Sequence, residues 1–438
     1  MSSTEPRLTA VKLLDKTFRS GSYSNIQLGN TLSRSDMEQR DKAFCSALYY
    51  GVIERRITLD HIISGLSSRP LNKLDSIILN ILRCGLYQIL YMESIPDSAA
   101  VNESVLLAKK AGKTSASGMV NAILRNFIRR DKKFDLPGEP GSIGRLSVEF
   151  SAPEEMIREL MENNALSLLD PDIRKDTVYI RRNPLRCTSD LLCDTLGGVV
   201  GKENIISMED ILPGCFAVKG GGDIIRTKAF EAGYFHVQSF ESQFCCKAVS
   251  PESGDIVYDM CAAPGGKTFT MAEYSPGGEI WSSDLHEKRV RLIKDGAGRL
   301  GLENIKASPR DASKFDESLP QFSKILCDVP CSGLGVIRSK PEIKYKSISD
   351  FAGLPQIQYD IAHNAVRYLR PGGILVYSTC TVRKAENGDV CDRLLSECPE
   401  LEPVTLPELP GVEPCSRMDF LPEMYGNGFF VAKFRKVR

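Results

Sequence analysis

The apolar residues in the first 130 positions of the chain recur at helical spacing. One stretch has them at Leu74, Ile77, Ile78, Ile81, Leu82, Leu86, Ile89 and Leu90. Neighbours three and four residues apart share one face of a helix. Strand-like alternation is scarce in this region, so we expect an all-α domain over residues 1–135.

The stretch FDLPGEPGSIG, residues 134–144, breaks the helical spacing. Its prolines and glycines are typical of a linker between domains. Beyond it, residues 145–235 combine a helical pattern around Glu154–Glu162 with short strand candidates such as Thr177–Ile180. They predict a small α+β middle domain that serves as a substrate groove or a connector.

After Phe235 the pattern changes to apolar strands that alternate with helical stretches. The strand candidates are DIVYDM, EIWSSD, KILCDV and GILVYS. Such alternation favours a largely parallel sheet with helices on both faces, so residues 236–438 predict an α/β Rossmann-like domain. Ligands bind such sheets at the carboxyl ends of the strands. The residues that follow the four strands are therefore the candidates for chemistry.

Positive charge is concentrated near the amino terminus, although the formal net charge of the chain is zero. Residues 1–133 hold 20 Lys and Arg against 12 Asp and Glu. The segment NAILRNFIRRDKK joins an apolar stripe to Arg125, Arg129 and Arg130, so that one helix face can pack while the other meets RNA phosphates. A packing helix with solvated charges accounts for the same pattern equally well.

Composition excludes several classes of protein. The chain shows no secretory signal and no run of about twenty apolar residues, so we expect a cytoplasmic protein that does not engage a membrane. The fourteen cysteines are scattered without a C-x-x-C pair, as expected of reduced thiols. The four histidines lack metal-ligand spacing, so no metal site is expected.

A glycine-containing loop follows the first strand of the predicted sheet. It comprises Cys261, Ala262, Ala263, Pro264, Gly265, Gly266 and Lys267. Paired glycines let a ligand approach the backbone closely. The loop has neither the Walker spacing nor G-x-G-x-x-G, which favours an adenosine-bearing cofactor over a phosphate cradle.

Acidic residues follow the strands on either side of this loop. Asp259 ends the first strand, and Asp284 ends the second, where a carboxylate can accept hydrogen bonds from ribose hydroxyls. Asp311 is expected after the next strand. A single Asp after a strand is more often a helix cap, but the three together with the glycine loop favour a nucleoside pocket.

Two cysteines follow the remaining strands of the predicted sheet. Cys331 stands in Asp328-Val329-Pro330-Cys331, and Cys380 follows Tyr377-Ser378-Thr379. One cysteine near a strand end is usually a small buried residue. Two at neighbouring strand ends, beside an acid and a cofactor loop, favour a catalytic pair.

The motifs CAAPGGKT, DVPCSGLG and YSTCTV resemble those of the RNA cytosine C5 methyltransferases, the group that includes the bacterial Sun/RsmB proteins. The amino-terminal segments RDKAFCSALYYGVIERRITLD, AAVNESVLLAKK and NAILRNFIRR resemble the NusB-type RNA-binding domain of that branch. The resemblance covers nearly the whole chain. The chain departs from the family pattern at Gln238-Ser239, at Thr381, and from Ser339 to Tyr345. The resemblance therefore does not define the detailed contacts with the substrate.

The resemblance implies S-adenosyl-L-methionine as the cofactor, held by the Cys261–Lys267 loop, Asp284, Asp311 and Asp328. It also implies Cys380 as the nucleophile and Cys331 as the thiol that assists product release. The implied substrate is small-subunit (16S) rRNA, unassembled or partly assembled, and the enzyme is expected to be a monomer.

The implied chemistry explains why such residues are needed. Carbon 5 of cytosine becomes nucleophilic enough for methylation after a thiolate adds to carbon 6. We expect Lys267 to favour the Cys380 thiolate, Asp328 to share a proton at the base edge, and Cys331 to remove the carbon-5 proton. Tyr345 is a candidate for stacking on the exposed base.

Two alternatives remain open from the sequence. An RNA-binding or assembly module could retain the cofactor fold without activity, although the intact loop and both cysteines argue against it. The same chemistry could also act on tRNA or on large-subunit rRNA.

Overall fold

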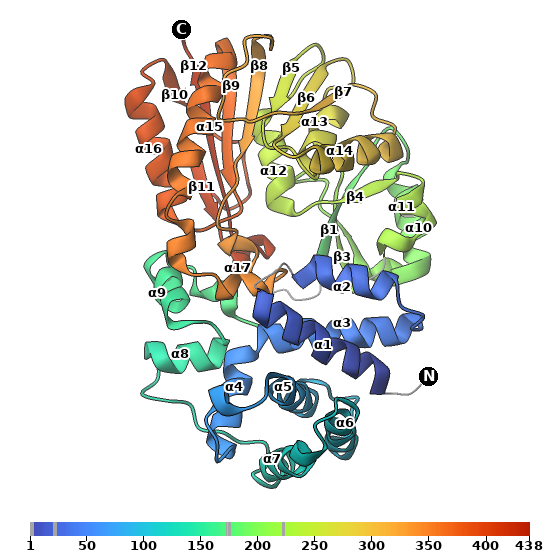
Figure 1. The fold of residues 1–438 in the computed structure, drawn as a ribbon. Helices are drawn as coiled ribbons and strands as arrows, with labels where there is room; N and C mark the ends of the chain where they lie inside the picture. The colour runs from blue at the N-terminus through green and yellow to red at the C-terminus, as the bar shows by residue number, and fades with distance from the viewer. Residues whose placement is uncertain (1–3, 21–23, 172, 174–176, 221–223) are drawn as a thin grey trace. The chain divides into compact units, whose positions relative to one another are not determined.

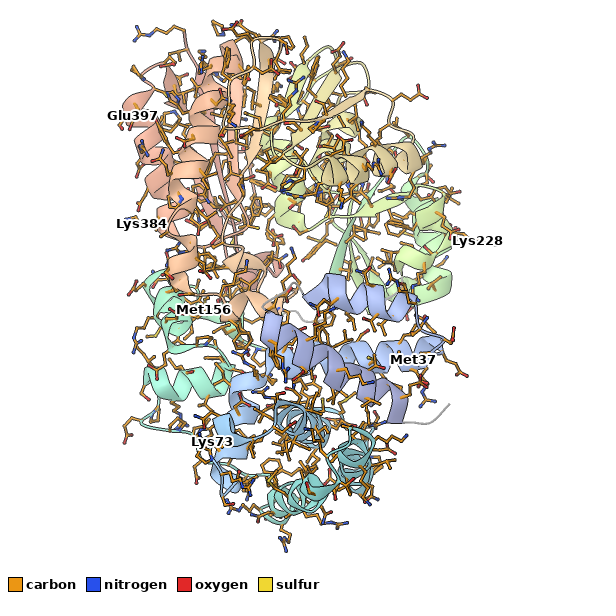
Figure 2. All side chains as sticks on the ribbon, in the orientation of Figure 1. Met37, Lys73, Met156, Lys228, Lys384 and Glu397 are labelled. Carbon is orange, nitrogen blue, oxygen red and sulfur yellow. The ribbon has the colours of Figure 1, made fainter. Side chains whose placement is uncertain are left out.

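The computed structural model describes the whole chain except residues 1–3, 21–23, 172, 174–176 and 221–223 (Figure 1). The chain divides into two compact units, with Met1–Met161 and Ser339–Ile348 in unit 1 and Glu162–Arg338 and Ser349–Arg438 in unit 2. In both units, apolar side chains form the interior and charged side chains such as Lys73 and Lys228 are exposed (Figure 2).

Unit 1 is helical, as the spacing predicts, and no strand occurs among its described residues. Its helices are α1 (Thr4–Ser20), α2 (Ser24–Ser33), α3 (Gln39–Glu54), α4 (Arg56–Leu66), α5 (Ser76–Tyr91), α6 (Asp97–Lys110), α7 (Ser117–Arg129) and α8 (Ile143–Phe150). The Asp75 carboxylate caps α5 by accepting the backbone N–H groups of Ile77 and Ile78. The apolar stripe of α5, including Ile81 and Leu86, is buried in the core.

The short segment Ser339–Ile348 folds with unit 1 although it lies far along the chain, between Cys331 and Cys380. It contains a 3-10 turn at Pro341–Tyr345. The sequence pattern does not predict this grouping, because the segment is too short to show a period. Helix α9 (Glu154–Glu162) spans the border between the two units.

A small antiparallel sheet with strand order β2-β3-β1-β4 occupies the start of unit 2. Its elements are β1 (Thr177–Arg182), α10 (Ser189–Val200), β2 (Ile205–Ser207), β3 (Cys215–Lys219), α11 (Lys228–Glu231) and β4 (Phe235–Val237). Buried residues from both helices and the sheet, among them Leu192 and Phe216, form a separate core cluster. This is the small α+β fold that the sequence predicts for the middle of the chain.

The larger sheet of unit 2 has the strand order β10-β12-β9-β8-β5-β6-β7, with β11 paired to β12. Its strands are β5 (Ile256–Asp259), β6 (Glu279–Asp284), β7 (Ile305–Pro309), β8 (Phe322–Asp328), β9 (Leu369–Thr379), β10 (Leu401–Pro403), β11 (Arg417–Phe420) and β12 (Phe429–Lys436). Strands β5 to β9 pair in parallel, and β12 is antiparallel to β9. The strand order reverses between β5 and β8, which is where such sheets bind ligands.

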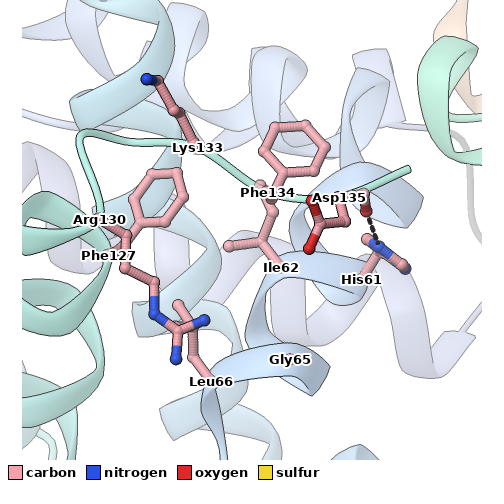
Figure 3. A pocket seen from close by; sticks show the side chains of 9 residues that line it. All are labelled: His61, Ile62, Gly65, Leu66, Phe127, Arg130, Lys133, Phe134 and Asp135. Carbon is pink, nitrogen blue, oxygen red and sulfur yellow. Dashed lines mark hydrogen bonds between the residues drawn. The ribbon is translucent and has the colours of Figure 1, made fainter. Parts of the chain in front are cut away.

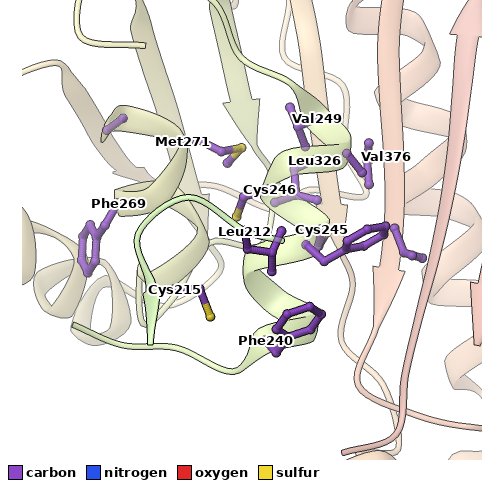
Figure 4. Close-up of a cluster of buried hydrophobic side chains, with 14 of the residues drawn as sticks. Leu212, Cys215, Phe240, Cys245, Cys246, Val249, Phe269, Met271, Leu326 and Val376 are labelled. Atoms are coloured by element: carbon purple, nitrogen blue, oxygen red, sulfur yellow. The ribbon is translucent and has the colours of Figure 1, made fainter. Parts of the chain in front are cut away.

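Helices cover both faces of this sheet, as predicted. They are α12 (Phe240–Val249), α13 (Gly266–Tyr274), α14 (Glu287–Leu300), α15 (Leu354–Tyr368), α16 (Gly388–Glu397) and the short α17 (Pro422–Tyr425). Leu326 and Val376 face the core under α12 to α14 (Figure 4), whereas Ile325 and Leu375 face α15 and α16. Successive strand residues point to opposite faces, so each strand contributes to both cores.

Among the described residues, no helix is long and apolar enough to cross a membrane.

Candidate active site

The glycine loop connects β5 to α13 at the point where the strand order reverses. Gly265 has a φ of +113°, and a side chain there would collide with the Phe269 ring, so glycine is required. A Cβ at Gly266 would meet nothing within 4 Å. The loop backbone is therefore open to a ligand at Gly266, as the sequence pattern suggests.

Asp259, at the end of β5, is fully buried beside this loop. Its Oδ2 accepts a hydrogen bond of 2.6 Å from the Thr268 hydroxyl, whereas its Oδ1 is buried with no hydrogen-bond partner among the described residues. Burial raises the pKa of this carboxyl to about 7. An unpartnered buried oxygen is costly unless a bound group donates to it, which fits a ligand with a free amino group.

Asp284 ends β6 as predicted, and its side chain is 4% exposed. Its carboxylate accepts the His286 backbone N–H and pairs with Arg289 at 3.1 Å. Arg289 also donates to the Ala263 carbonyl at 2.8 Å. The guanidinium thus ties Asp284 to the glycine loop.

Asp311 follows β7 by two residues, as expected. Its carboxylate accepts the Ser313 N–H and hydroxyl, and it pairs with Lys314 at 3.0 Å. The side chain therefore caps its own turn, while Asp311 also lines an open cavity of about 280 Å³ with Met260 and Tyr368.

Lys267 and Asp328 form a half-buried ion pair of 2.7 Å. Ser378 donates to the other oxygen of Asp328 at 2.8 Å. Burial alone would lower the pKa of Lys267, but the Asp328 charge and nearby thiols outweigh burial and raise it. The ammonium that we expected beside Cys380 is thus bound to Asp328.

Cys331 and Cys380 lie together, with their Sγ atoms 3.2 Å apart. They meet because β8 and β9 are parallel neighbours with Asp328 opposite Ser378, so the loops after the two strands begin side by side. The pKa of Cys331 is raised well above its ordinary value by the hydrogen bond to Cys380, then by burial, and then by the charges of Cys380, Glu386 and Asp328. The two thiols therefore form one hydrogen bond in which either sulfur can be the donor.

A group of polar side chains that the sequence pattern does not reveal contacts the two cysteine loops. Glu386, Asn387, Gln358, Ser332 and Thr381 are all buried there. The only sequence signal is a Glu-Asn pair six residues after Cys380, and such a pair is common in loops. No spacing rule identifies buried polar groups that come from different elements.

The three arginines proposed to contact RNA lie on α7 and just after it, and all are exposed. Arg125 donates to Asn121 at 2.9 Å. Arg130 lines a cavity of about 380 Å³ with His61, Phe134 and other residues of unit 1 (Figure 3). His61 contacts the Asp135 carbonyl at 2.8 Å on the opposite wall.

Tyr345, the candidate for stacking on the base, packs within unit 1. Its hydroxyl donates to the Ile53 carbonyl at 2.8 Å, and Arg56 lies over its ring at 3.9 Å, all within unit 1. The neighbouring Lys344 is also buried and donates to the Glu54 carbonyl at 2.8 Å. The ring is therefore part of the packing of unit 1, and its stacking on a base stays a prediction.

All fourteen cysteines lie in the described part of the chain, and none forms a disulfide. Among the described residues, no group of three or more His, Cys, Asp or Glu side chains is arranged to hold a metal ion.

The fold and site define a Rossmann-like enzyme of the S-adenosylmethionine-dependent methyltransferase class. Residues 246–435 match the family described as 16S rRNA methyltransferase RsmB/F, and residues 4–129 match the NusB family. A Bacillus subtilis protein named probable ribosomal RNA small subunit methyltransferase B is 34% identical over the full length of both chains. The chain belongs to the RsmB/F family.

Other proteins support this assignment. Ribosomal RNA small subunit methyltransferase B from Klebsiella pneumoniae is 29% identical over 94% of this chain and 96% of its own. The solved structure of PH0851 shares the fold over 100% of this chain and 99% of its own, with a TM-score of 0.79 and 21% identity. NSun6 from Pyrococcus horikoshii, solved with the S-adenosylmethionine analogue SFG, covers 65% of this chain and 98% of its own, at 22% identity and a TM-score of 0.56. The cofactor is S-adenosylmethionine.

Proposed function

We propose that this protein methylates carbon 5 of a cytosine in small-subunit rRNA through a covalent adduct between Cys380 and carbon 6. The observation that carries the proposal is the pair of thiols 3.2 Å apart at the ends of adjacent strands, beside Asp328. The curated relatives are named as small-subunit rRNA methyltransferases, which supports this choice of RNA.

The cofactor, when bound, supplies an electrophilic methyl group. The residues proposed to hold it are Cys261, Ala262, Ala263, Pro264, Gly265, Gly266, Lys267, Asp284, Asp311 and Asp328, to which the structure adds Asp259. Gly266 leaves the backbone open, and the unpartnered Asp259 oxygen can accept from the amino group. Asp284, fixed by Arg289, suits the ribose hydroxyls.

Cys380 attacks carbon 6 as a thiolate, because a neutral ring is too poor a nucleophile at carbon 5 to take the methyl group. Cys331, whose pKa is raised first by its hydrogen bond to Cys380, keeps the proton of the pair. This arrangement supplies the thiolate without requiring a lysine next to it.

As negative charge develops at N3 of the ring, a proton of the Lys267–Asp328 pair is passed through the Asp328 carboxylate and shared with N3, which stabilises that charge. Lys267 and Ser378 bind its two oxygens and so fix the plane of the carboxylate. Lys267 acts in this proposal by orienting Asp328 and by supplying the proton that Asp328 shares with N3.

Product release requires a base for the proton on carbon 5. Once Cys380 is bonded to carbon 6, its hydrogen bond and its charge no longer raise the pKa of Cys331, and Cys331 gives its proton to water. Burial and the charges of Glu386 and Asp328 still raise this pKa, so the Cys331 thiolate is a strong base. This thiolate then takes the carbon-5 proton, the carbon 6–sulfur bond breaks, and the electron pair returns to Cys380. One proton is released per methyl group transferred.

The RNA is proposed to contact Arg125, Arg129 and Arg130, whose side chains are exposed on unit 1. The side chains of Arg129 and Arg130 have no hydrogen-bond or ion-pair partner within the described part of the chain, so their charges are available to phosphates. We further propose that the enzyme acts as a monomer on unassembled or partly assembled rRNA.

The test is incubation with methyl-labelled cofactor and separate samples of small-subunit rRNA, large-subunit rRNA and tRNA, followed by nucleoside analysis. We expect labelled 5-methylcytosine in small-subunit rRNA alone. Label in another nucleoside would contradict the carbon-5 chemistry. Label in another RNA would change the substrate and leave the chemistry standing.

A further inference from the structure

Two adjacent residues, Glu386 and Asn387, contact the loops of both proposed catalytic cysteines. Glu386 ends a short 3-10 turn at Lys384–Glu386, and both side chains are almost completely inaccessible to solvent, with exposures of 0% and 2%. Buried polar groups are tolerated where they form hydrogen bonds. The hydrogen-bond partners of Glu386 and Asn387 therefore show which parts of the chain these two residues fix in place.

The Glu386 carboxylate holds the Cys331 loop. Its Oε2 accepts the Ser332 backbone N–H at 2.9 Å and the Gln358 amide at 2.8 Å. The same Gln358 amide donates to the Pro330 carbonyl at 3.0 Å. The residues on both sides of Cys331 are therefore fixed by one buried pair.

The Asn387 amide holds the Cys380 loop in the same way. Its oxygen accepts from the Thr379 hydroxyl at 2.6 Å, and its nitrogen donates to the Thr381 carbonyl at 3.1 Å. These are the residues on either side of Cys380. The two loops are also joined directly, because the Ser332 and Thr381 hydroxyls lie 2.7 Å apart.

Glu386 carries a charge into this cluster. Its contacts are with N–H donors, including the Arg383 guanidinium at 3.1 Å, and a carboxylate that only accepts hydrogen bonds is ionised. The Asp328 charge also acts on Cys331, and Asp328 is paired with Lys267.

We propose that Glu386 and Asn387 are positioning residues that hold the two cysteine loops together, and that the Glu386 charge keeps the shared proton on Cys331, leaving Cys380 as the thiolate. The Glu386 charge is among the causes that raise the pKa of Cys331, after the Cys380 hydrogen bond and burial. The catalytic consequence rests on the proposed function, but the distribution of the proton does not.

The test measures thiol reactivity in the full-length enzyme without RNA. Wild type, Glu386→Gln and a matched control, Glu241→Gln, are alkylated with iodoacetamide over a pH series, and Cys331 and Cys380 are followed by peptide mass spectrometry. Glu241 is also fully buried, so its variant controls for the loss of a buried carboxyl. Thermal unfolding verifies that each variant is folded.

We expect Cys380 to react at lower pH than Cys331 in wild type and in the control. In Glu386→Gln the two profiles should converge, with Cys331 reacting several-fold faster relative to Cys380 at pH 7, because loss of the negative charge lowers the pKa of Cys331 and one pKa unit changes the thiolate fraction about tenfold. Unchanged profiles in Glu386→Gln, or Cys331 reacting first in wild type, would overturn the proposal.

Glu386→Asp separates charge from reach, because it keeps the carboxylate but shortens it. The order of alkylation should stay as in wild type, whereas the maximal methylation rate should fall with little change in the KM for RNA. If Glu386→Gln does not fold, Glu386→Asp is used to test the role of the charge. Alkylation of Cys331 before Cys380 in Glu386→Asp would refute that role. Absence of 5-methylcytosine in the wild-type assay would reject the proposed function without altering the alkylation result.

Discussion

Individual residues in this site are distinguished by what surrounds them more than by their type. Cys331 and Cys380 are equivalent in the sequence, since each follows a strand of one sheet. In the structure, the Glu386 carboxylate binds the loop of Cys331, whereas the neutral Asn387 amide binds the loop of Cys380. This asymmetry supports the separate roles of attack and release.

Asp259 yields a prediction for cofactor binding. Burial raises its pKa to about 7, opposed by the Thr268 hydrogen bond, with further effects from Asp328, Lys267 and Asp284. If the cofactor amino group donates to the ionised Asp259, binding favours the carboxylate, so affinity gains as the pH rises through about 7. Titration calorimetry on wild type and Asp259→Asn should give an affinity difference that grows from pH 6 to pH 8.

The comparison with Asp259→Asn isolates this carboxyl from the titration of the cofactor itself. Equal affinities at every pH would show that Asp259 does not meet a donor on the cofactor.

The elements of unit 2 are linked by a buried ion pair between β1 and α13. Arg181 donates to Glu273 at 2.9 Å, with side-chain exposures of 3% and 0%. His236 lies 3.7 Å from the same carboxylate, but burial lowers its pKa to about 3, so it is neutral there. The pair joins the small sheet to the helix that follows the cofactor loop.

Removing only the cation should destabilise unit 2. Arg181→Met leaves a buried carboxylate without its partner, at a cost of about 3 kcal/mol or more in the free energy of unfolding. Burial already raises the pKa of Glu273 to about 7 in the presence of Arg181. When the pKa of a carboxyl is higher in the folded state than in the unfolded state, the protein becomes less stable as the pH rises through the folded-state pKa. The loss of unfolding free energy caused by Arg181→Met should therefore be larger at pH 8 than at pH 6.

Chemical unfolding of the Arg181→Met variant at both pH values measures this difference. The double variant Arg181→Met, Glu273→Leu should recover most of the loss, because no charge is then buried alone. A loss that is independent of pH, or a double variant no more stable than Arg181→Met, would argue against the ion pair as its cause.

Most elements of the fold could be predicted from the sequence, because they depend on local periodicity. The strands that end at Asp259, Asp284 and Asp328, and helix α9, occur where the pattern indicates. The Glu386 cluster and the burial of Tyr345 depend on contacts between distant segments. The periodicity of one sequence gives no information about contacts between segments that are far apart in the chain. A polar residue in a loop is usually solvated, so its burial is not expected.

At the scale of the whole molecule, the two units suggest a division of tasks, with RNA contact on unit 1 and the transfer chemistry in unit 2. The positive charge of the amino-terminal region and the exposed Arg129 and Arg130 support this division. The NusB match over residues 4–129 covers the same region.

Replacing Arg129 and Arg130 with Gln should weaken RNA binding and reduce its salt dependence. Each lost phosphate contact should lower the slope of log K against log salt by about 0.7 for single-stranded RNA. Anisotropy of a labelled rRNA fragment over a salt series measures the slope, and Lys12→Gln serves as a control with one exposed cation removed from another helix. An unchanged slope in the double variant would show that the RNA contacts other residues. The affinity for the cofactor should be unaffected in all variants.

The most direct test of the account is covalent trapping of RNA by cysteine variants. Cys331→Ala and Cys380→Ala proteins are incubated with cofactor and small-subunit rRNA, resolved under denaturing conditions, and mapped by mass spectrometry. The account predicts that Cys331→Ala accumulates an adduct through Cys380, whereas Cys380→Ala forms none and is inactive. An adduct in Cys380→Ala but not in Cys331→Ala would contradict it, because the two thiols would then have exchanged roles.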